Sequence, residues 1–582
     1  MMSPSFIGFL GLDFRLSLDF RLRTICFLIC IFVFNACAKN TKDLDDLENE
    51  SDFQDLQNEA EDAGTNEDHQ SNNDPNQPND PKMQALQCQG TVTKNTEVKT
   101  SYGLVEGKIQ GATISFLGIP FANQPIEERR WQKAQALDRC YPDDFKAVMH
   151  PPACPQLDDT QVIGREDCLA LNIWTPINAK PNTLPVMVFI HGGGNLQGSA
   201  GESVQNEVIY DGSLLAEKSQ SVVVVIQYRL GILGWLNIDD QINGNFGLSD
   251  QIEALKWIKS EISAFGGHDD QITIFGESAG ARNVCTLIAS PQTKDLFQSA
   301  IMQSGACLLP SASQVQSESL SWLAQTPCAS TPKNQVRDCL NQQSLVVLLT
   351  AKPPQLNIAG KSSNFQPYVD GILLKESPLT AIENGRFHIK SLIVGSNQQE
   401  TSRSVPQITS EAEYRRLIEA QFGRISAQIL NQYPVDTDHT PLDRYIEVTS
   451  DAKFVCNAMR IARKAHQSLN LYSYSFAQIL SNAPRLKSFG AYHGIELLFV
   501  FQQLQKWGYR PNNAELKTSE QMMQYWTNLA DLENLERSNA LIEWPLFAQQ
   551  GETLIFGKDG LKIEKDFKKS TCEFWDQLYV DF

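Results

Sequence analysis

A serine between two glycines is the clearest sign of chemistry in this chain of 582 residues. Ser278 is the centre of the motif GESAG, between the strand-like run QITIF and the apolar, helix-like run ARNVCTLIA. Flanking glycines allow a sharp turn that exposes the hydroxyl, and a helix N-terminus stabilises negative charge beside it. The alternative is a tight turn with a bystander serine. The flanking strand and helix favour a nucleophile.

A glycine cluster upstream of this serine could stabilise the charge that such chemistry creates. Residues 191–194 read HGGG and follow the strand-like run VMVFI. Attack on an ester carbonyl places negative charge on its oxygen, so backbone N–H groups must converge there, and glycine permits the close approach. The alternatives are a flexible turn or a phosphate-binding loop, but neither GxGxxG nor GxxxxGK[ST] occurs here. The cluster therefore predicts an oxyanion hole.

Alternating strands and helices must position these motifs. Continuous apolar runs predict buried strands at 185–190, 221–226, 271–275, 299–303 and 391–395. Between them, residues 248–265 show a helical pattern, with Ile252, Leu255 and Ile258 on one face and glycines at the end. Unbroken apolar strands imply a sheet that is covered on both sides. We predict an α/β fold with a large, mostly parallel central sheet, helices on both faces and long insertions.

Composition and charge exclude several classes of protein. The chain is 42% hydrophobic and 20% charged, which excludes a collagen-like, coiled-coil or wholly disordered protein. A net charge of −19 argues against nucleic-acid binding. Eight scattered histidines without an HExxH motif argue against a zinc site, and no metal or cofactor is expected.

Much of the negative charge lies in one stretch that precedes the first predicted strand. Residues 43–80 hold 14 Asp and Glu and no Lys or Arg, and they are poor in aromatics. Such a composition buries too little apolar surface to offset chain entropy. We predict an acidic disordered linker over 38–85. The alternative is an acidic interaction tail.

The N-terminus carries the features of an export signal. Arg21 and Arg23 precede the apolar run ICFLICIFVF, which is too short to span a bilayer comfortably and is typical of a signal peptide. The run ends in FNAC, which resembles a bacterial lipoprotein lipobox with Phe34 where Leu is usual. We predict a targeting segment over 1–37, lipidation at Cys37, and an exported protein anchored to a membrane and facing the periplasm or cell surface. Ordinary signal cleavage nearby and a short membrane anchor are the alternatives.

The cysteine count agrees with export. Three of the 13 cysteines lie in the targeting segment, which leaves ten, and no CxxC motif occurs among them. An even number after an export signal favours disulfides over metal or redox chemistry. Spacing alone leaves their pairing open.

Together the motifs resemble the type-B carboxylesterase family, which includes the cholinesterases and has the α/β-hydrolase fold. The resemblance runs from about Tyr102 to the C-terminus. The segments that carry it lie at 116–131, 165–176, 189–195, 227–236, 245–251, 265–280, 302–305, 490–501 and 572–578. It implies a single catalytic domain over 86–582.

The resemblance also places the remaining catalytic groups. SNQQET matches the family segment G-x-N-x-x-E-G and makes Glu400 the acid, with Gln399 where Asp is usual and Thr401 where Gly is usual. His493 in GAYHGIE is the base. The order serine, acid, histidine is that of this fold. The oxyanion donors carry over to the backbone of Gly193, Gly194 and Ala279.

The same resemblance implies structural pairs. Cys154–Cys168 and Cys328–Cys339 match two short loop bridges, and Cys456–Cys572 matches a long-range bridge. Cys88–Cys140 and Cys285–Cys307 remain. Arg130 and Glu166 match an ion pair of the family.

Substrate class is only partly indicated. The loop between Cys154 and Cys168 has 13 intervening residues and no tryptophan. Cholinesterases have a longer loop there, with an aromatic residue that stacks on choline, so a choline-ester specialist is disfavoured. Four aromatic residues could line a pocket or belong to the core: Tyr102, Trp131, Trp235 and Phe246. We expect a broad carboxylic-ester hydrolase acting on small esters through an acyl-serine. The alternatives are a lipase, a carbamate or amide hydrolase, or a non-catalytic adhesion or recognition protein.

Overall fold

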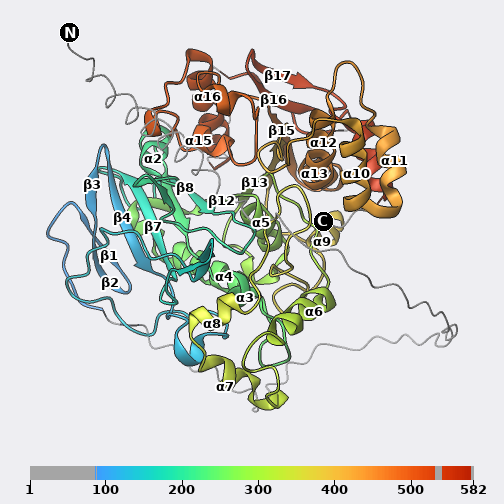
Figure 1. Ribbon diagram of the computed structural model, residues 1–582. Coiled ribbons are helices and arrows are strands. Elements are labelled where there is room, and N and C mark those ends of the chain that lie inside the picture. Colours follow the sequence, from blue (N-terminus) through green and yellow to red (C-terminus); the bar gives the residue numbers. More distant parts are fainter. Residues whose placement is uncertain (1–85, 87, 531–540, 549, 579–582) are drawn as a thin grey trace, which may run out of the picture.

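The computed structural model describes residues 86, 88–530, 541–548 and 550–578 (Figure 1). The predicted targeting segment 1–37, with Cys37, and the predicted linker 38–85 lie outside the described residues. Within the described part of the chain, no helix combines the length and the apolar character needed to cross a membrane.

A mixed sheet of eleven strands forms the centre of the molecule (Figure 1). The six pairings from β11 across β8 to β16 are parallel, and the pairings at both edges are antiparallel. The predicted mostly parallel sheet is therefore confirmed. In spatial order the strands are β17 (Gly560–Glu564), β16 (Thr553–Gly557), β15 (Asn470–Phe476), β14 (Ser391–Asn397), β13 (Ser299–Gln303), β12 (Gly267–Glu277), β8 (Leu184–Ile190), β11 (Val222–Ile226), β7 (Ala170–Pro176), β4 (Thr113–Pro120) and β3 (Lys108–Gln110).

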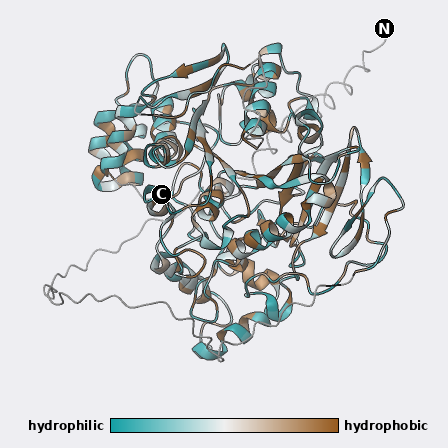
Figure 2. Ribbon diagram, turned by 180° about the vertical axis from the view of Figure 1, so that it is seen from behind, coloured by the Kyte–Doolittle hydropathy of each residue, from teal (hydrophilic) through white to brown (hydrophobic). Residues whose placement is uncertain are grey.

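Side chains of the central strands pack into apolar clusters on both faces of the sheet, as β8 shows. In β8, Val186 and Val188 belong to one apolar cluster, whereas Met187 and Phe189 belong to another. The first cluster includes residues of α4 (Phe246–Glu261), α5 (Ala279–Ala289) and α13 (Cys456–Ala465), and the second those of α2 (Ser213–Ser219), α15 (Glu496–Val500) and α16 (Asn513–Ala530). Figure 2 shows the apolar central strands and, at the periphery, the largely hydrophilic helices α10 (Glu411–Phe422) and α11 (Ser426–Gln432). Helices on both faces are thus confirmed.

The five predicted strands correspond to β8, β11, β12, β13 and β14. The predicted helix over 248–265 is α4, which begins at Phe246, followed by a 3-10 turn, Ile262–Phe265, that ends at Gly266 with φ of 93°. One charged residue at the end of α4 is not exposed to solvent. Glu261 is buried rather than solvated, because its carboxylate accepts hydrogen bonds from the backbone N–H and the hydroxyl of Ser101 at 2.8 and 2.6 Å.

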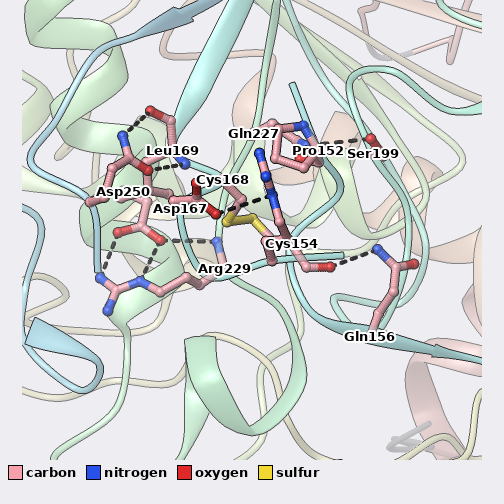
Figure 3. The surroundings of a disulfide bond; sticks show 12 residues. Pro152, Cys154, Gln156, Asp167, Cys168, Leu169, Ser199, Gln227, Arg229 and Asp250 are labelled. Carbon is pink, nitrogen blue, oxygen red and sulfur yellow. Dashed lines mark hydrogen bonds and ion pairs between the residues drawn. A yellow bond between two sulfur atoms is a disulfide. The ribbon is translucent and has the colours of Figure 1, made fainter. Parts of the chain in front are cut away.

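Ten cysteines of the described chain form five disulfides, which include the three pairs that the family resemblance implies and the two that then remained. The bonds are Cys88–Cys140, Cys154–Cys168, Cys285–Cys307, Cys328–Cys339 and Cys456–Cys572. Figure 3 shows the second of these beside a buried ion pair between Arg229 and Asp250, whose atoms approach to 2.6 Å. The predicted pair of Arg130 and Glu166 is also present, as a bidentate contact at 2.5 and 2.8 Å. Disulfides in this number fit an oxidising compartment.

Candidate active site

The predicted nucleophile lies on a strained turn between a strand and a helix. β12 ends at Glu277, α5 begins at Ala279, and Ser278 between them has φ of 58° and ψ of −119°. A positive φ is uncommon for a residue with a side chain and marks stored strain. A Cβ atom at Gly280 would lie 2.0 Å from the carbonyl oxygen of Ile190, so only glycine allows α5 to pack this closely on β8. The turn therefore presents Ser278 at the carboxyl end of the parallel strands.

The glycine cluster lies against this turn. Gly193 and Gly194 have φ of 105° and 64°, and a Cβ atom at Gly193 would lie 1.9 Å from the carbonyl oxygen of Gln197. A Cβ atom at Gly192 would lie 3.1 Å from that of Ser278. Gly194, Ser278 and Ala279 line one small cavity. Two of the three predicted oxyanion donors, Gly194 and Ala279, thus line the same cavity as the serine.

The predicted acid and base are in direct contact. Oε2 of Glu400, fully buried, accepts a hydrogen bond from His493 Nδ1 at 2.6 Å, while its Oε1 accepts one from the backbone N–H of Asn397 at 2.8 Å. The backbone N–H of His493 also donates to the carbonyl oxygen of Glu400 at 3.0 Å. Because Nδ1 carries the proton shared with the carboxylate, Nε2 is left to act as the base.

The two residues that depart from the family pattern around Glu400, Gln399 and Thr401, both form hydrogen bonds. Gln399 donates its backbone N–H to Ala491 O at 3.0 Å and accepts the Ala491 N–H on its side chain at 2.9 Å. The Thr401 hydroxyl is buried and lies 2.6 Å from the Thr449 hydroxyl. The first residue thus holds the segment before His493, and the second joins the Glu400 loop to α12 (Pro441–Ser450).

A second carboxylate, which the sequence analysis did not identify, lies at the other nitrogen of the imidazole. His493 Nε2 lies 3.1 Å from Glu277 Oε1, and within the described chain it forms no hydrogen bond to Ser278. The Phe454 ring packs on the imidazole with centroids 4.6 Å apart. The contact between Ser278 and His493 therefore stays a prediction. Catalytic hydrogen bonds of this kind often tighten only when substrate binds.

Buried carboxylates set the protonation of the site. Burial alone would lower the pKa of His493, but the charges of Glu277 and Glu400 outweigh it and raise that pKa to about 9. Burial raises the pKa of Glu277 itself, and that of Glu496 to about 7. Two sequence signals could have revealed them: Glu277 is charged at the end of an apolar strand, and Glu496 follows His493 by only three residues.

Two cavities meet at these groups. The larger, of about 570 Å³, is lined by His493, Glu277 and Glu400, and the smaller, of about 50 Å³, by Ser278. Ile358 lines both. The four aromatic residues considered as pocket candidates line neither cavity, since Trp131, Trp235 and Phe246 are buried in the core and Tyr102 packs against it.

The sequence model of the carboxylesterase family matches residues 94–575. This chain belongs to the carboxylesterase family. It is 30% identical to a human cocaine esterase, over 79% of this chain and 86% of that protein, and 31% identical to a mouse cholinesterase, over 82% and 86%. Among solved structures it is similar to a thermophilic PNB esterase, with a TM-score of 0.71 and 29% identity over 83% of this chain and all of that one. The α/β-hydrolase fold and the identity as a carboxylesterase follow.

The activity of this carboxylesterase should rise with pH through the alkaline range. Only neutral imidazole can accept the serine proton, and the pKa of His493 is raised to about 9, so kcat/KM for a neutral ester should reach half its maximum well above the ordinary histidine value of about 6.5. Glu277→Gln removes one of the charges responsible and should lower this midpoint by about one pH unit.

Profiles of kcat/KM from about pH 5 to about pH 10 measure the shift. Glu564→Gln, on the edge strand β17, is the matched control and should keep the wild-type midpoint. A Glu277→Gln midpoint equal to that of the wild type would contradict the electrostatic role of Glu277.

Proposed function

We propose that residues 86–582 form a catalytic domain that hydrolyses carboxylic esters through an acyl-Ser278 intermediate. His493 is the general base and acid, and Glu400 orients it. The observation that carries the proposal is the 2.6 Å contact between Glu400 Oε2 and His493 Nδ1. Glu400 and Ser278 both follow the carboxyl ends of parallel strands, β14 and β12. Glu400 and His493 form the acid–base pair that a serine needs, because its neutral hydroxyl is a poor nucleophile.

Acylation begins when His493 Nε2 takes the proton of the Ser278 hydroxyl as its oxygen attacks the ester carbonyl. The negative charge on the tetrahedral intermediate lies in the hole formed by the N–H groups of Gly193, Gly194 and Ala279. Its collapse breaks the bond to the alcohol, which leaves with the proton from Nε2. A water molecule then attacks the acyl-serine by the same steps and releases the acid and free Ser278.

Two negative charges support the imidazolium that forms in each half of the reaction. Glu400 contacts Nδ1 and Glu277 lies 3.1 Å from Nε2. For acylation, Nε2 must turn from Glu277 toward Ser278. Each oxyanion donor in such a site contributes about 100- to 1000-fold in rate.

The named relatives act on different esters, so the family does not fix the substrate. They include the cocaine esterase, the cholinesterase and a mouse acylcarnitine hydrolase that is 32% identical over 81% of this chain and 89% of that protein. We propose a broad range of small esters. The short loop of 13 residues between Cys154 and Cys168 still argues against specialisation for choline esters.

p-Nitrophenyl esters of increasing acyl length test this proposal. An acyl-serine that forms faster than it hydrolyses should give a burst of about one p-nitrophenolate per active chain, followed by steady turnover. p-Nitrophenyl carbamates and p-nitroanilides distinguish carbamate and amide hydrolysis from ester hydrolysis. A non-catalytic recognition protein would leave every substrate intact, and that outcome would refute the proposal.

We also propose that the protein is exported, with 1–37 as its targeting segment, Cys37 as the lipidated residue and 38–85 as a spacer. The five disulfides support an oxidising compartment. Cys37→Ala should move the protein from the membrane fraction to the soluble fraction of the exported compartment, because the lipid anchor is lost. Cys26→Ala, in the same segment, is the control. Membrane retention of the Cys37→Ala protein would contradict the anchor.

A further inference from the structure

One tryptophan lies outside both apolar clusters of the fold. The chain has nine tryptophans, and eight of them belong to one of the two clusters that flank the sheet. The ninth, Trp507, belongs to neither, and it lines the larger cavity together with His493. In the part of the chain that the structure describes, no other aromatic ring stacks on this indole and no cation lies over it. A large aromatic surface is thus left unused by the core.

The backbone at Trp507 has a conformation that is unfavourable for a large side chain. Its φ and ψ are 55° and 25°, in the left-handed region, where glycine and asparagine are common and bulky residues are rare. A turn alone could be made at lower cost with asparagine at this position. Strain of this kind gathers at sites that bind ligands. The conformation therefore indicates that the indole itself has a role.

Hydrogen bonds to a second segment fix this tryptophan in the cavity wall. The indole N–H donates to the carbonyl oxygen of Val204 at 3.1 Å, and the neighbouring Lys506 ammonium donates to that of Val208 at 2.9 Å. Ile209, in the same second segment, lines the cavity as well. Because the only polar atom of the indole is bonded to the wall, the side chain offers apolar aromatic surface to a ligand.

The chemistry of the proposed reaction decides which half of an ester meets Trp507. His493 must deliver its proton to the leaving alcohol, so the alcohol lies on the side of the histidine. His493 and Trp507 line the cavity of about 570 Å³, whereas Ser278 lines the one of about 50 Å³. Five leucines add to the apolar lining of the larger cavity: Leu480, Leu486, Leu497, Leu498 and Leu504. The larger cavity therefore has the volume and the lining for a bulky, apolar alcohol.

We propose that Trp507 is a stacking platform for an aromatic ring in the alcohol half of the ester, which makes esters of arylalkyl alcohols preferred substrates. This inference rests on the proposed acyl-serine mechanism. A flat ring in offset contact with the indole gains more than burial of the same area provides. Trp507 is thus a specificity-determining residue that contacts the alcohol and takes no part in proton transfer.

Two acetate esters of equal alcohol length test the preference in the wild-type protein. One is 3-phenylpropyl acetate, with a flat ring, and the other is 3-cyclohexylpropyl acetate, with a saturated and more hydrophobic ring. The acyl group and the leaving hydroxyl are the same in both. We expect kcat/KM to be about three- to tenfold higher for the phenyl ester, the gain typical of an aromatic pair beyond area burial. Competitive inhibition by the two free alcohols should follow the same order, because binding alone produces it.

Variants assign the preference to Trp507. Trp507→Leu removes the aromatic face and should bring the ratio of the two kcat/KM values to about one. Trp507→Asn also removes the ring and suits the positive φ, so it replaces the leucine variant if that variant fails to fold. Gln505→Leu is the matched control and should keep the wild-type ratio, because Gln505 is exposed and does not line the cavity. A fluorophosphonate that labels Ser278 counts active sites in each preparation.

The outcomes separate this inference from the function on which it rests. A wild-type ratio of one or less, with both esters hydrolysed and Ser278 labelled, would overturn the aromatic platform and leave the esterase mechanism intact. A variant without the ring that keeps the wild-type ratio would overturn the assignment to Trp507. Neither ester hydrolysed and no label at Ser278 would overturn the proposed function itself.

Discussion

Replacing Ser278 with alanine should lower kcat for ester hydrolysis by about 10,000-fold or more. The proposed mechanism forms the acyl intermediate on this hydroxyl, and α5 and the glycine cluster lie beside it. What remains in the variant is the rate that the oxyanion hole and binding give to attack by water. Steady-state hydrolysis of a p-nitrophenyl ester, measured together with loss of the burst, checks the prediction.

Ser299→Ala is the matched control for this variant. Ser299 is a buried serine on the neighbouring strand β13 and takes no part in the proposed mechanism. Its variant should hydrolyse the ester at a rate within about threefold of the wild type. Wild-type activity in the Ser278→Ala protein would refute the nucleophile assignment.

Replacing Glu400 with glutamine should lower kcat by about 1,000- to 10,000-fold while KM changes little. The amide can present its N–H toward His493 Nδ1, where the carboxylate now accepts at 2.6 Å. That exchange favours the tautomer with the proton on Nε2, which cannot act as a base. It also removes a negative charge that stabilises the imidazolium.

Glu261→Gln tests whether loss of any buried acid has this effect. Glu261 is buried in α4 and accepts hydrogen bonds from Ser101, away from both cavities. Its variant should keep kcat even if its melting temperature falls. A Glu400→Gln enzyme with wild-type kcat would show that another group orients His493.

Much of the fold could be predicted because the signals are local. Residues 222–226 are apolar at every position, as a strand covered on both faces requires, and β11 has these bounds. The turn at Ser278 was predictable for the same reason, since its glycines, strand and helix are contiguous. The acid, the base and the disulfide pairs needed the family resemblance, because their partners are distant in the sequence.

The electrostatics around these groups could not be predicted in the same way. The 3.1 Å approach of Glu277 to His493 joins residues more than 200 positions apart, and spacing carries no record of it. Arg282 and Lys453 are more than 150 positions apart in the sequence and line the same small cavity as Ser278 only in the folded chain. The burial of Glu261 could not be predicted either. The helical pattern shows which face of α4 is apolar, but it does not show that Ser101 lies over the Glu261 carboxylate.

The positive φ at Ser278 means that the residue proposed as the nucleophile also opposes folding. A conformation of this kind costs about 1–3 kcal/mol, whereas glycine would adopt it with little penalty. Selection for thermal resistance alone would therefore favour an inert chain with glycine at this position. A stabilised variant that keeps Ser278 must therefore gain its stability from residues elsewhere.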